Sequence, residues 1–312
     1  MKRALVLGVV GGLIFLVAPS FLSSYYLGLL TKMLIFALFA MSLDLLLGYS
    51  GLPSLGHAAY FGLGSYTVAL LALKLAVKNL WIGSLASLVS VLILALGFVP
   101  LTLRARGDYY LMITLALSQV IWGIAFGWRS MTGGDDGLPG IARPALAGTW
   151  SIAGEIPFYY FTLIIFWAAL WLMAVIVRSP FGKALVGIRE SETRMRVLGY
   201  NVWAYQYVAS ILAALFAGLA GILFVYYNGY VGPAYLSIIF SAQALLMVLL
   251  GGAGSLFGPA LGAGIIVMLE NLISAWTERW LLILGAIYVV VTLFAPQGLH
   301  GLIRQLRMGR AQ

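Results

Sequence analysis

Apolar stretches of about twenty residues recur along the whole chain, and this repetition limits the fold more than any other feature. A helix needs about 20 apolar residues to cross roughly 30 Å of bilayer hydrocarbon. Only 9% of the 312 residues are charged, whereas a soluble domain carries about 25% charge to solvate its surface. The sequence therefore predicts an all-α fold, a polytopic transmembrane helix bundle forming one domain over residues 1–312. About ten spans are expected, near residues 4–20, 27–47, 56–73, 80–101, 109–128, 158–177, 204–227, 236–251, 259–275 and 280–295.

The basic residues orient the predicted bundle. Lys2 and Arg3 precede an apolar stretch that we interpret as an uncleaved first span, because Pro19 lies where a signal peptide would be cleaved. With ten spans and the N-terminus inside, basic residues are concentrated on the cytoplasmic side, as the positive-inside rule requires. Both termini are then cytoplasmic, and the net charge of +9 reflects an anionic leaflet rather than nucleic-acid binding. The inner set holds 12 of the 18 basic residues: Lys2, Arg3, Arg104, Arg106, Arg178, Lys183, Arg189, Arg194, Arg196, Arg304, Arg307 and Arg310.

Two connections between spans are long. The outer one covers residues 129–157 and contains the sequence TGGDDG. The inner one covers residues 178–203 and is termed the coupling segment below. Within it, apolar residues alternate with charged ones from Lys183 to Leu198, which predicts one short amphipathic helix at the membrane surface rather than a span.

The sequence lacks the motifs of an ATP-hydrolysing enzyme or a metal site. No G-x-x-x-x-G-K-[ST] loop is present, because Gly182-Lys183 lacks both the upstream glycine and the following Ser or Thr. Cysteine is absent, which excludes disulfides and thiolate zinc sites. His57 and His300, the two histidines, are too few for a metal site without cysteine. The chain is therefore expected to have no catalytic site and to bind no metal or cofactor.

A glycine-rich segment, GYSGLPSLGHAAYFGLG at residues 48–64, predicts a broken helix. Non-helical backbone at membrane depth is tolerated only where protein buries it or water reaches it. Its free N–H and C=O groups would suit the charged ends of a zwitterionic substrate; alternatively, the glycines only permit close helix packing. The motif LLGYSG at 46–51 resembles LLGGAG at 249–254, and an internal repeat with broken helices stays open as a second interpretation.

Three ionisable residues of the predicted spans are candidates for a functional role. Asp44 is interpreted either as a proton-coupling or substrate-ammonium site, or as a buried group paired with backbone N–H groups near Gly48, and we prefer the second interpretation. Glu270 is expected at the outer interface. His57 is expected to begin a helix and to bond nearby backbone rather than to carry protons.

Five segments, in order along the chain, resemble the permease subunits of high-affinity branched-chain amino-acid ABC importers. The likeness is to the longer of the two sister permeases of that family, and it covers most of the chain after the first span. The segments are GYSGLPSLGHAAYFGLGSY at 48–66, LRARGDYYLMITLALSQVI at 103–121, TGGDDGLPGI at 132–141, SPFGKALVGIRESETRMRVLGYNV at 179–202 and GGAGSLFGPALGAGI at 251–265.

This resemblance implies a type II ABC-importer-like permease in a bacterial inner membrane. Its partners would be a sister permease, two ATPase subunits that bind ATP and magnesium, and a periplasmic solute-binding protein. The coupling segment would dock on an ATPase, although Thr193-Arg194-Met195 departs from the small residues usual there. Alternatives are a urea or short-chain amide importer of the same family, or a proton-coupled secondary transporter using Asp44.

The resemblance also assigns roles to individual positions. The coupling contacts would be Phe181, Lys183, Arg189, Glu190, Glu192 and Gly199. The translocation path would be lined by Asp44, Gly48, Tyr49, Gly51, Ser54, Gly56 and His57. The periplasmic docking residues would be Thr132, Gly133, Gly134 and Asp135.

Overall fold

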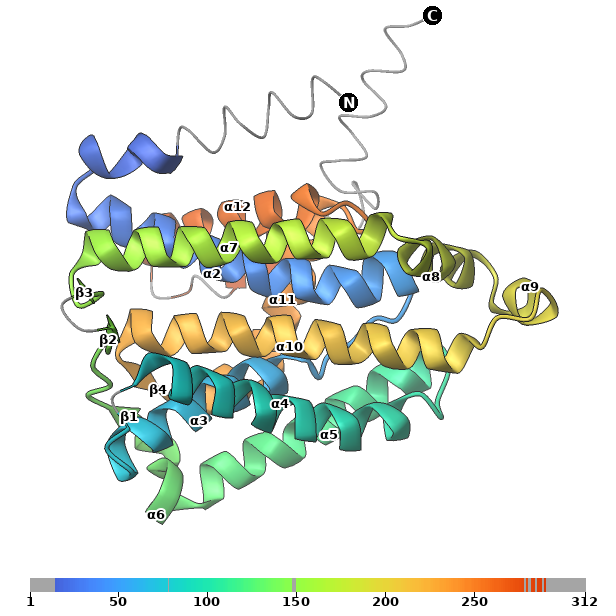
Figure 1. Ribbon diagram of the computed structural model, residues 1–312, viewed down its shortest axis with the longest axis horizontal. Helices are drawn as coiled ribbons and strands as arrows, with labels where there is room; N and C mark the ends of the chain where they lie inside the picture. Colours follow the sequence, from blue (N-terminus) through green and yellow to red (C-terminus); the bar gives the residue numbers. More distant parts are fainter. Residues whose placement is uncertain are drawn as a thin grey trace, which may run out of the picture.

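The computed structural model describes residues 15–77, 79–147, 150–277, 279, 282–283, 285–287 and 289. Within them the chain forms a bundle of long helices (Figure 1). Six of these helices are long and apolar enough to cross a membrane, so the prediction of an all-α polytopic fold is confirmed. The helices are α2 (Ser24–Asp44), α3 (His57–Lys74), α4 (Leu80–Thr102), α5 (Asp108–Gly127), α6 (Arg129–Thr132), α7 (Glu155–Arg178), α8 (Pro180–Glu190), α9 (Glu192–Val197), α10 (Val202–Asn228), α11 (Ile238–Gly251) and α12 (Phe257–Ser274).

Helices lie at all the expected spans between residues 24 and 274, but α3 and α11 are not among the six that could cross a membrane. Helix α3, at the expected span 56–73, is long enough but too polar, because it carries His57, Thr67 and Lys74. The stretch expected to cross at 236–251 forms α11, whose 14 residues reach only about 21 Å. A 3₁₀ turn, η4 (Pro233–Leu236), precedes α11 and takes the place of its first turns. The expected first and last spans, at 4–20 and 280–295, lie largely outside the described residues.

Polar caps explain where several helices begin. The Asn79 side chain accepts a hydrogen bond from Trp81 N at 2.9 Å at the start of α4. Ser179 caps α8, with Pro180 in its first turn, and Asn201 caps α10. Each cap satisfies a backbone N–H that has no acceptor within the helix.

Two helices form the centre of the bundle. The apolar window of residues 24–50 is 78% buried and that of α10 is 72% buried, against 22% for α5. Aromatic rings pack between α2, α10 and α3. The ring of Phe36 in α2 lies 5.7 Å from that of Phe224 in α10, and the ring of Phe61 in α3 lies 5.4 Å from that of Phe224. The peripheral helices α4, α5, α7 and α12 keep apolar faces exposed, as lipid-facing helices do.

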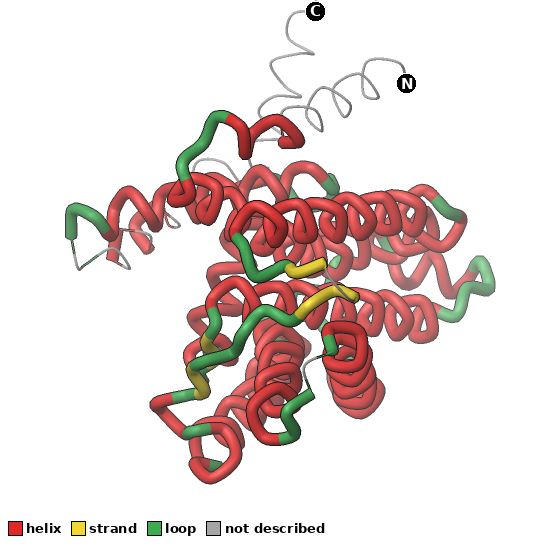
Figure 2. The backbone as a smooth tube through the Cα atoms, turned by 60° about the vertical axis from the view of Figure 1, so that its left-hand side comes forward, coloured by secondary structure: helices red, strands yellow, loops and turns green. Residues whose placement is uncertain are grey.

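The two ends of the bundle differ. Short strands, which the sequence did not predict, lie at one end, and α8 and α9 project from the other (Figures 1 and 2). Strand β1 (Leu138–Pro139) pairs antiparallel with β4 (Tyr230–Val231), and β2 (Ala145–Ala147) pairs with β3 (Trp150–Ser151). These ends are named outer and inner, after the orientation that the basic residues predict.

Candidate coupling and translocation site

The two glycine-rich motifs meet at the inner end of the bundle. Helix α2 continues into a π-helical turn, η2 (Leu45–Ser50), and breaks at Gly51, whose φ of 74° is left-handed. The second break follows α11 and includes Gly254, at φ +82°. A Cβ atom at Gly48 would lie 2.7 Å from Cα of Gly254, so the two backbones touch without side chains between them. Gly48 itself is helical, and the expected break there lies at Gly51 instead.

Asp44 and Arg189 hold this glycine crossing together. Gly254 N donates to Asp44 Oδ1 at 2.8 Å, and Arg189 Nη1 donates to the carbonyl oxygen of Gly48. A Cβ at Gly51 would lie 2.8 Å from Cγ of Arg189. Asp44 is fully buried. Its predicted pairing with backbone N–H is thus found, although the donor belongs to the second glycine motif rather than to the first.

The coupling segment is amphipathic, as expected, but it forms two helices. Leu185, Ile188 and Met195 are all buried against the bundle. The expected single helix is wrong because the chain bends at Ser191, whose φ of −163° is extended. The Ser191 hydroxyl accepts from Arg194 N at 3.3 Å and so begins α9.

The predicted coupling residues separate into inward-facing and exposed sets. Arg189 reaches the glycine crossing, and Phe181 stacks on Tyr205 with ring centroids 5.4 Å apart. Glu192 pairs with Arg196 at 3.0 Å and accepts from Gln206 at 3.1 Å. Lys183, Glu190 and Gly199 are exposed, and Arg189 is exposed too, although its guanidinium reaches the Gly48 carbonyl.

Sequence analysis missed two apolar residues of the coupling segment. Val197 is 83% exposed and Leu198 is 64% exposed, at the end of α9. They lie among basic residues on a segment that projects from the inner end of the bundle (Figure 1). Their position beside Arg194 and Arg196, outside every apolar stretch, was the available signal. An apolar pair in such a place is typical of a protein contact.

The predicted path residues lie mostly in helix packing. Asp44, Gly48, Tyr49 and His57 are buried, whereas Gly51 is exposed at the inner end. His57 begins α3 as expected, but its Nε2 bonds the Ser42 hydroxyl at 2.8 Å rather than backbone.

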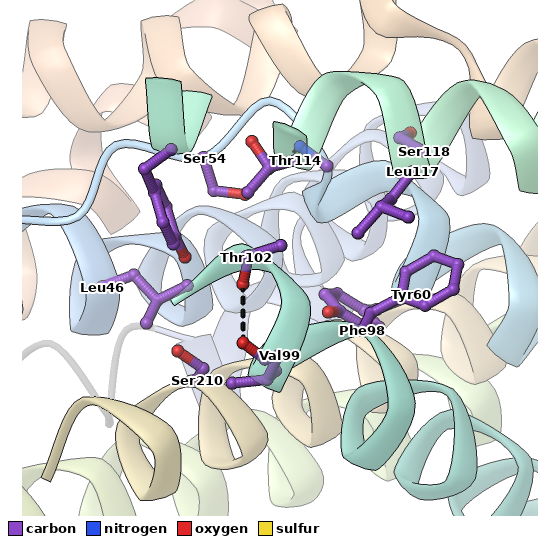
Figure 3. Close-up of a pocket in the computed structure, with 12 residues that line it drawn as sticks. Leu46, Ser54, Tyr60, Phe98, Val99, Thr102, Thr114, Leu117, Ser118 and Ser210 are labelled. Atoms are coloured by element: carbon purple, nitrogen blue, oxygen red, sulfur yellow. Dashed lines mark hydrogen bonds between the residues drawn. The ribbon is translucent and has the colours of Figure 1, made fainter. Parts of the chain in front are cut away.

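Two of the predicted path residues, Ser54 and Gly56, line a cavity between α3, α4, α5 and α10, shown in Figure 3. Its walls carry hydroxyl groups, of which that of Thr102 donates to the Val99 carbonyl at 3.0 Å. The cavity holds about 20 Å³, enough for a water molecule. An amino acid does not fit there in this conformation. The lining hydroxyls are those of Ser54, Tyr60, Thr102, Tyr110, Thr114, Ser118 and Ser210.

The predicted periplasmic docking residues form a tight turn at the outer end. Thr132 is buried, and its hydroxyl donates to the Ala125 carbonyl at 2.6 Å. Gly133 and Gly134 adopt positive φ values of 78° and 62°. Asp135 is exposed. The threonine and the glycines therefore build the turn, and the aspartate is the member that a partner can reach.

The chain was then compared with known proteins. The family described as "branched-chain amino acid transport system / permease component" matches residues 25–292. The chain belongs to this family. The permease is 30% identical to the high-affinity branched-chain amino acid transport system permease protein LivM of Salmonella typhimurium, over 94% of this chain and 75% of that protein. It is 29% identical to LivM of Escherichia coli, over 93% of this chain and 73% of that protein.

LivH of Salmonella typhimurium is 23% identical, over 85% of the permease and 91% of LivH. The predicted likeness to the longer sister permease is therefore confirmed, because identity to LivM exceeds identity to LivH. The permease is a transport component of a branched-chain amino acid system rather than an enzyme. No solved structure matches it.

Proposed function

We propose that this permease and a sister permease form the translocation path of an ATP-driven importer for leucine, isoleucine and valine. The full chain crosses a bacterial inner membrane with about ten spans of the type II importer kind, with both termini in the cytoplasm. The basic inner end supports this orientation. Its similarity to both LivM and LivH supports pairing with a LivH-like partner.

The bond between Arg189 and the Gly48 carbonyl is the observation that carries the coupling proposal. Arg189 belongs to α8, which lies outside the expected spans, whereas Gly48 belongs to the helix that continues from α2. A shift of α8 therefore acts directly on the backbone where both glycine motifs meet. ATP and magnesium bind in two partner ATPases, and their closure moves α8.

Exposed groups at the two ends are the proposed partner contacts. Lys183, Glu190, Val197 and Leu198 face an ATPase at the inner end, and Asp135 faces a solute-binding protein at the outer end. The glycine-broken stretch of residues 44–57 lines the path when the bundle opens. Ser54 and Gly56 already border a small hydroxyl-lined cavity.

Uptake into proteoliposomes tests the proposal. The permease, its sister, both ATPases and the binding protein are reconstituted together, and radiolabelled leucine, urea and acetamide are offered separately. We expect leucine uptake that requires ATP and both ATPases. Leucine uptake by this chain alone under a proton gradient would support the secondary-transporter alternative. Uptake of urea or acetamide instead of leucine would correct the substrate.

The coupling step is tested with Arg189→Ala in the assembled importer. The variant loses the bond to Gly48, so ATP hydrolysis is expected to continue while leucine uptake falls at least tenfold. Arg106→Ala, which removes an exposed arginine of the inner end outside the coupling segment, is the control for loss of a positive charge. Equal uptake by Arg189→Ala and the wild type would remove Arg189 from the coupling machinery.

A further inference from the structure

A second cavity, here termed the outer cavity, lies where α2, α10, α11 and α12 approach the outer end. It exists because α11 is short. The ring of Phe240, in the first turn of α11, lies 5.6 Å from the ring of Phe36. Phe36 is twelve residues after the start of α2, which is about 18 Å along that helix. The space above this turn holds about 460 Å³, within the range of small-molecule sites.

Two opposite charges line the outer cavity. Lys32 Nζ lies 3.3 Å from Glu270 Oε1, with side chains 24% and 19% exposed. Gln243 Nε2 donates to Glu270 Oε2 at 3.3 Å. Lys32 lies about 12 Å along α2 from Ser24. Charges at such depth are costly and mark functional sites by default. An ion pair that only held α2 against α12 would not require a cavity beside it.

The wall next to this ion pair is aromatic. Phe36 lies one turn from Lys32, and its ring is 5.7 Å from Phe224 and 5.6 Å from Phe240. Tyr235 packs 5.6 Å from Phe240 and also lines the cavity. Lys32 Nζ lies 5.7 Å from the centroid of the Phe36 ring, so these rings present an apolar surface beside the ion pair.

The start of α11 adds positive character to the same cavity. Ser237 and Ile239 line the cavity, and the Ser237 hydroxyl accepts from Phe240 N at 3.4 Å. The first turn of a helix leaves backbone N–H groups without intrahelical acceptors, and its dipole favours negative charge. Broken helices in transporters direct such ends at substrate carboxylates.

We propose that the outer cavity binds a free, zwitterionic α-amino acid with an apolar side chain. Glu270 accepts hydrogen bonds from the α-ammonium group, Lys32 and the start of α11 hold the α-carboxylate, and the aromatic wall covers the side chain. The inference rests on the proposed transport function, and it places substrate contact within this chain rather than only in a binding protein.

Equilibrium binding of radiolabelled leucine to the full permease in nanodiscs tests the site. Isoleucine and valine are expected to displace leucine. The analogue 4-methylpentanoate, which lacks the ammonium group, and leucinol, which lacks the carboxylate, are expected to compete at least tenfold less well. Equal competition by these analogues would show that the ion pair has no part in binding.

Variants separate the site from a clamp between helices. Glu270→Gln is expected to weaken leucine binding at least tenfold, and Glu270→Asp to restore part of it, with thermal stability measured for each. Glu155→Gln, an acid at the outer end outside this cavity, is the control. Undetectable leucine binding to the wild type, or unchanged binding by Glu270→Gln, overturns the inference. ATP-driven uptake in the reconstituted importer would in that case leave the proposed function standing.

Discussion

Asp44 shows how one buried side chain joins distant parts of the chain. Its Oδ1 accepts from Gly254 N, 210 residues away in sequence, at 2.8 Å. Gly48 lies one turn later and contacts the Gly254 backbone. A larger residue at either glycine would separate the segments, and a residue without an acceptor at 44 would leave a buried N–H unpaired. Oδ1 acts as a hydrogen-bond acceptor, whereas the buried Oδ2 bonds no other described residue, so an acceptor role and a proton-coupling role lead to different predictions.

Substitutions at Asp44 distinguish these two roles. Asp44→Asn keeps an oxygen for Gly254 N, so we expect a folded protein that retains most ATP-driven leucine uptake. Asp44→Leu leaves the N–H unpaired, which costs about 1–3 kcal/mol, so a lower unfolding temperature in detergent is expected. Loss of uptake in a stable Asp44→Asn protein would favour a proton-coupling role.

At the scale of elements, the division of the coupling segment into α8 and α9 separates two tasks. Helix α8 packs Leu185 and Ile188 on the bundle and sends Arg189 to the glycine crossing. Helix α9 ends in the exposed Val197, followed by Leu198. The bend at Ser191 turns these apolar side chains away from the bundle. One helix therefore contacts the rest of the bundle, while the other presents the exposed apolar pair that we propose docks on an ATPase.

The proposed docking surface is tested by making it polar. Val197→Ser combined with Leu198→Ser removes two apolar side chains, each worth about 1.5–3 kcal/mol when buried. We expect a tenfold or greater loss of ATPase affinity, measured by co-purification and by titration in nanodiscs. Thr193→Ser, an exposed neighbour on α9 that loses little apolar area, is the control. Unchanged affinity of the double variant would place the docking surface elsewhere.

The spans could be predicted because hydropathy is a local property of the sequence. The strands could not, since β1 and β4 are two residues long and pair across 90 residues of chain. The same holds for the glycine crossing and for the Lys32–Glu270 pair, whose members are far apart in sequence. The bend within the coupling segment did have a local signal. Ser191, followed by Glu192, is a typical residue for a helix start.

For the candidate site, sequence reasoning identified the segments better than the individual roles. Arg189, which was expected to contact an ATPase, is exposed and also bonds the first glycine motif. Thr132 was expected to meet a binding protein, but its hydroxyl closes a turn. A long side chain or a hydroxyl on a predicted helix or loop can contact either the rest of the protein or a partner. Which contact it makes depends on the residues packed around it, and these are not evident from the sequence.

At the scale of the whole molecule, the orientation of the bundle decides every partner assignment. The strands and α6, which directly precedes the turn with Asp135, lie at one end, and α9 and α8, which contains Lys183, lie at the other (Figure 1). Because the chain contains no cysteine, single substitutions report on each end without a background signal.

Labelling of intact cells with a membrane-impermeant maleimide tests this orientation. Asp135→Cys is expected to be labelled in intact cells, because that side chain is exposed at the predicted periplasmic end. Lys183→Cys is expected to be labelled only after the membrane is permeabilised. The unsubstituted chain is the control. Labelling of Lys183→Cys in intact cells would invert the bundle and contradict the proposed docking of ATPases on α8 and α9.

Helix α10 connects both faces of the permease. Its 27 residues measure about 40 Å. It begins at the end of the coupling segment and ends at the β1–β4 strand pair beside the TGG turn. When such a helix moves along its axis as a rigid body, both of its ends are displaced by the same distance. A movement of the coupling segment could therefore reach the outer strands through one continuous helix. The distance over which it is transmitted would be the length of that helix, without a series of side-chain rearrangements.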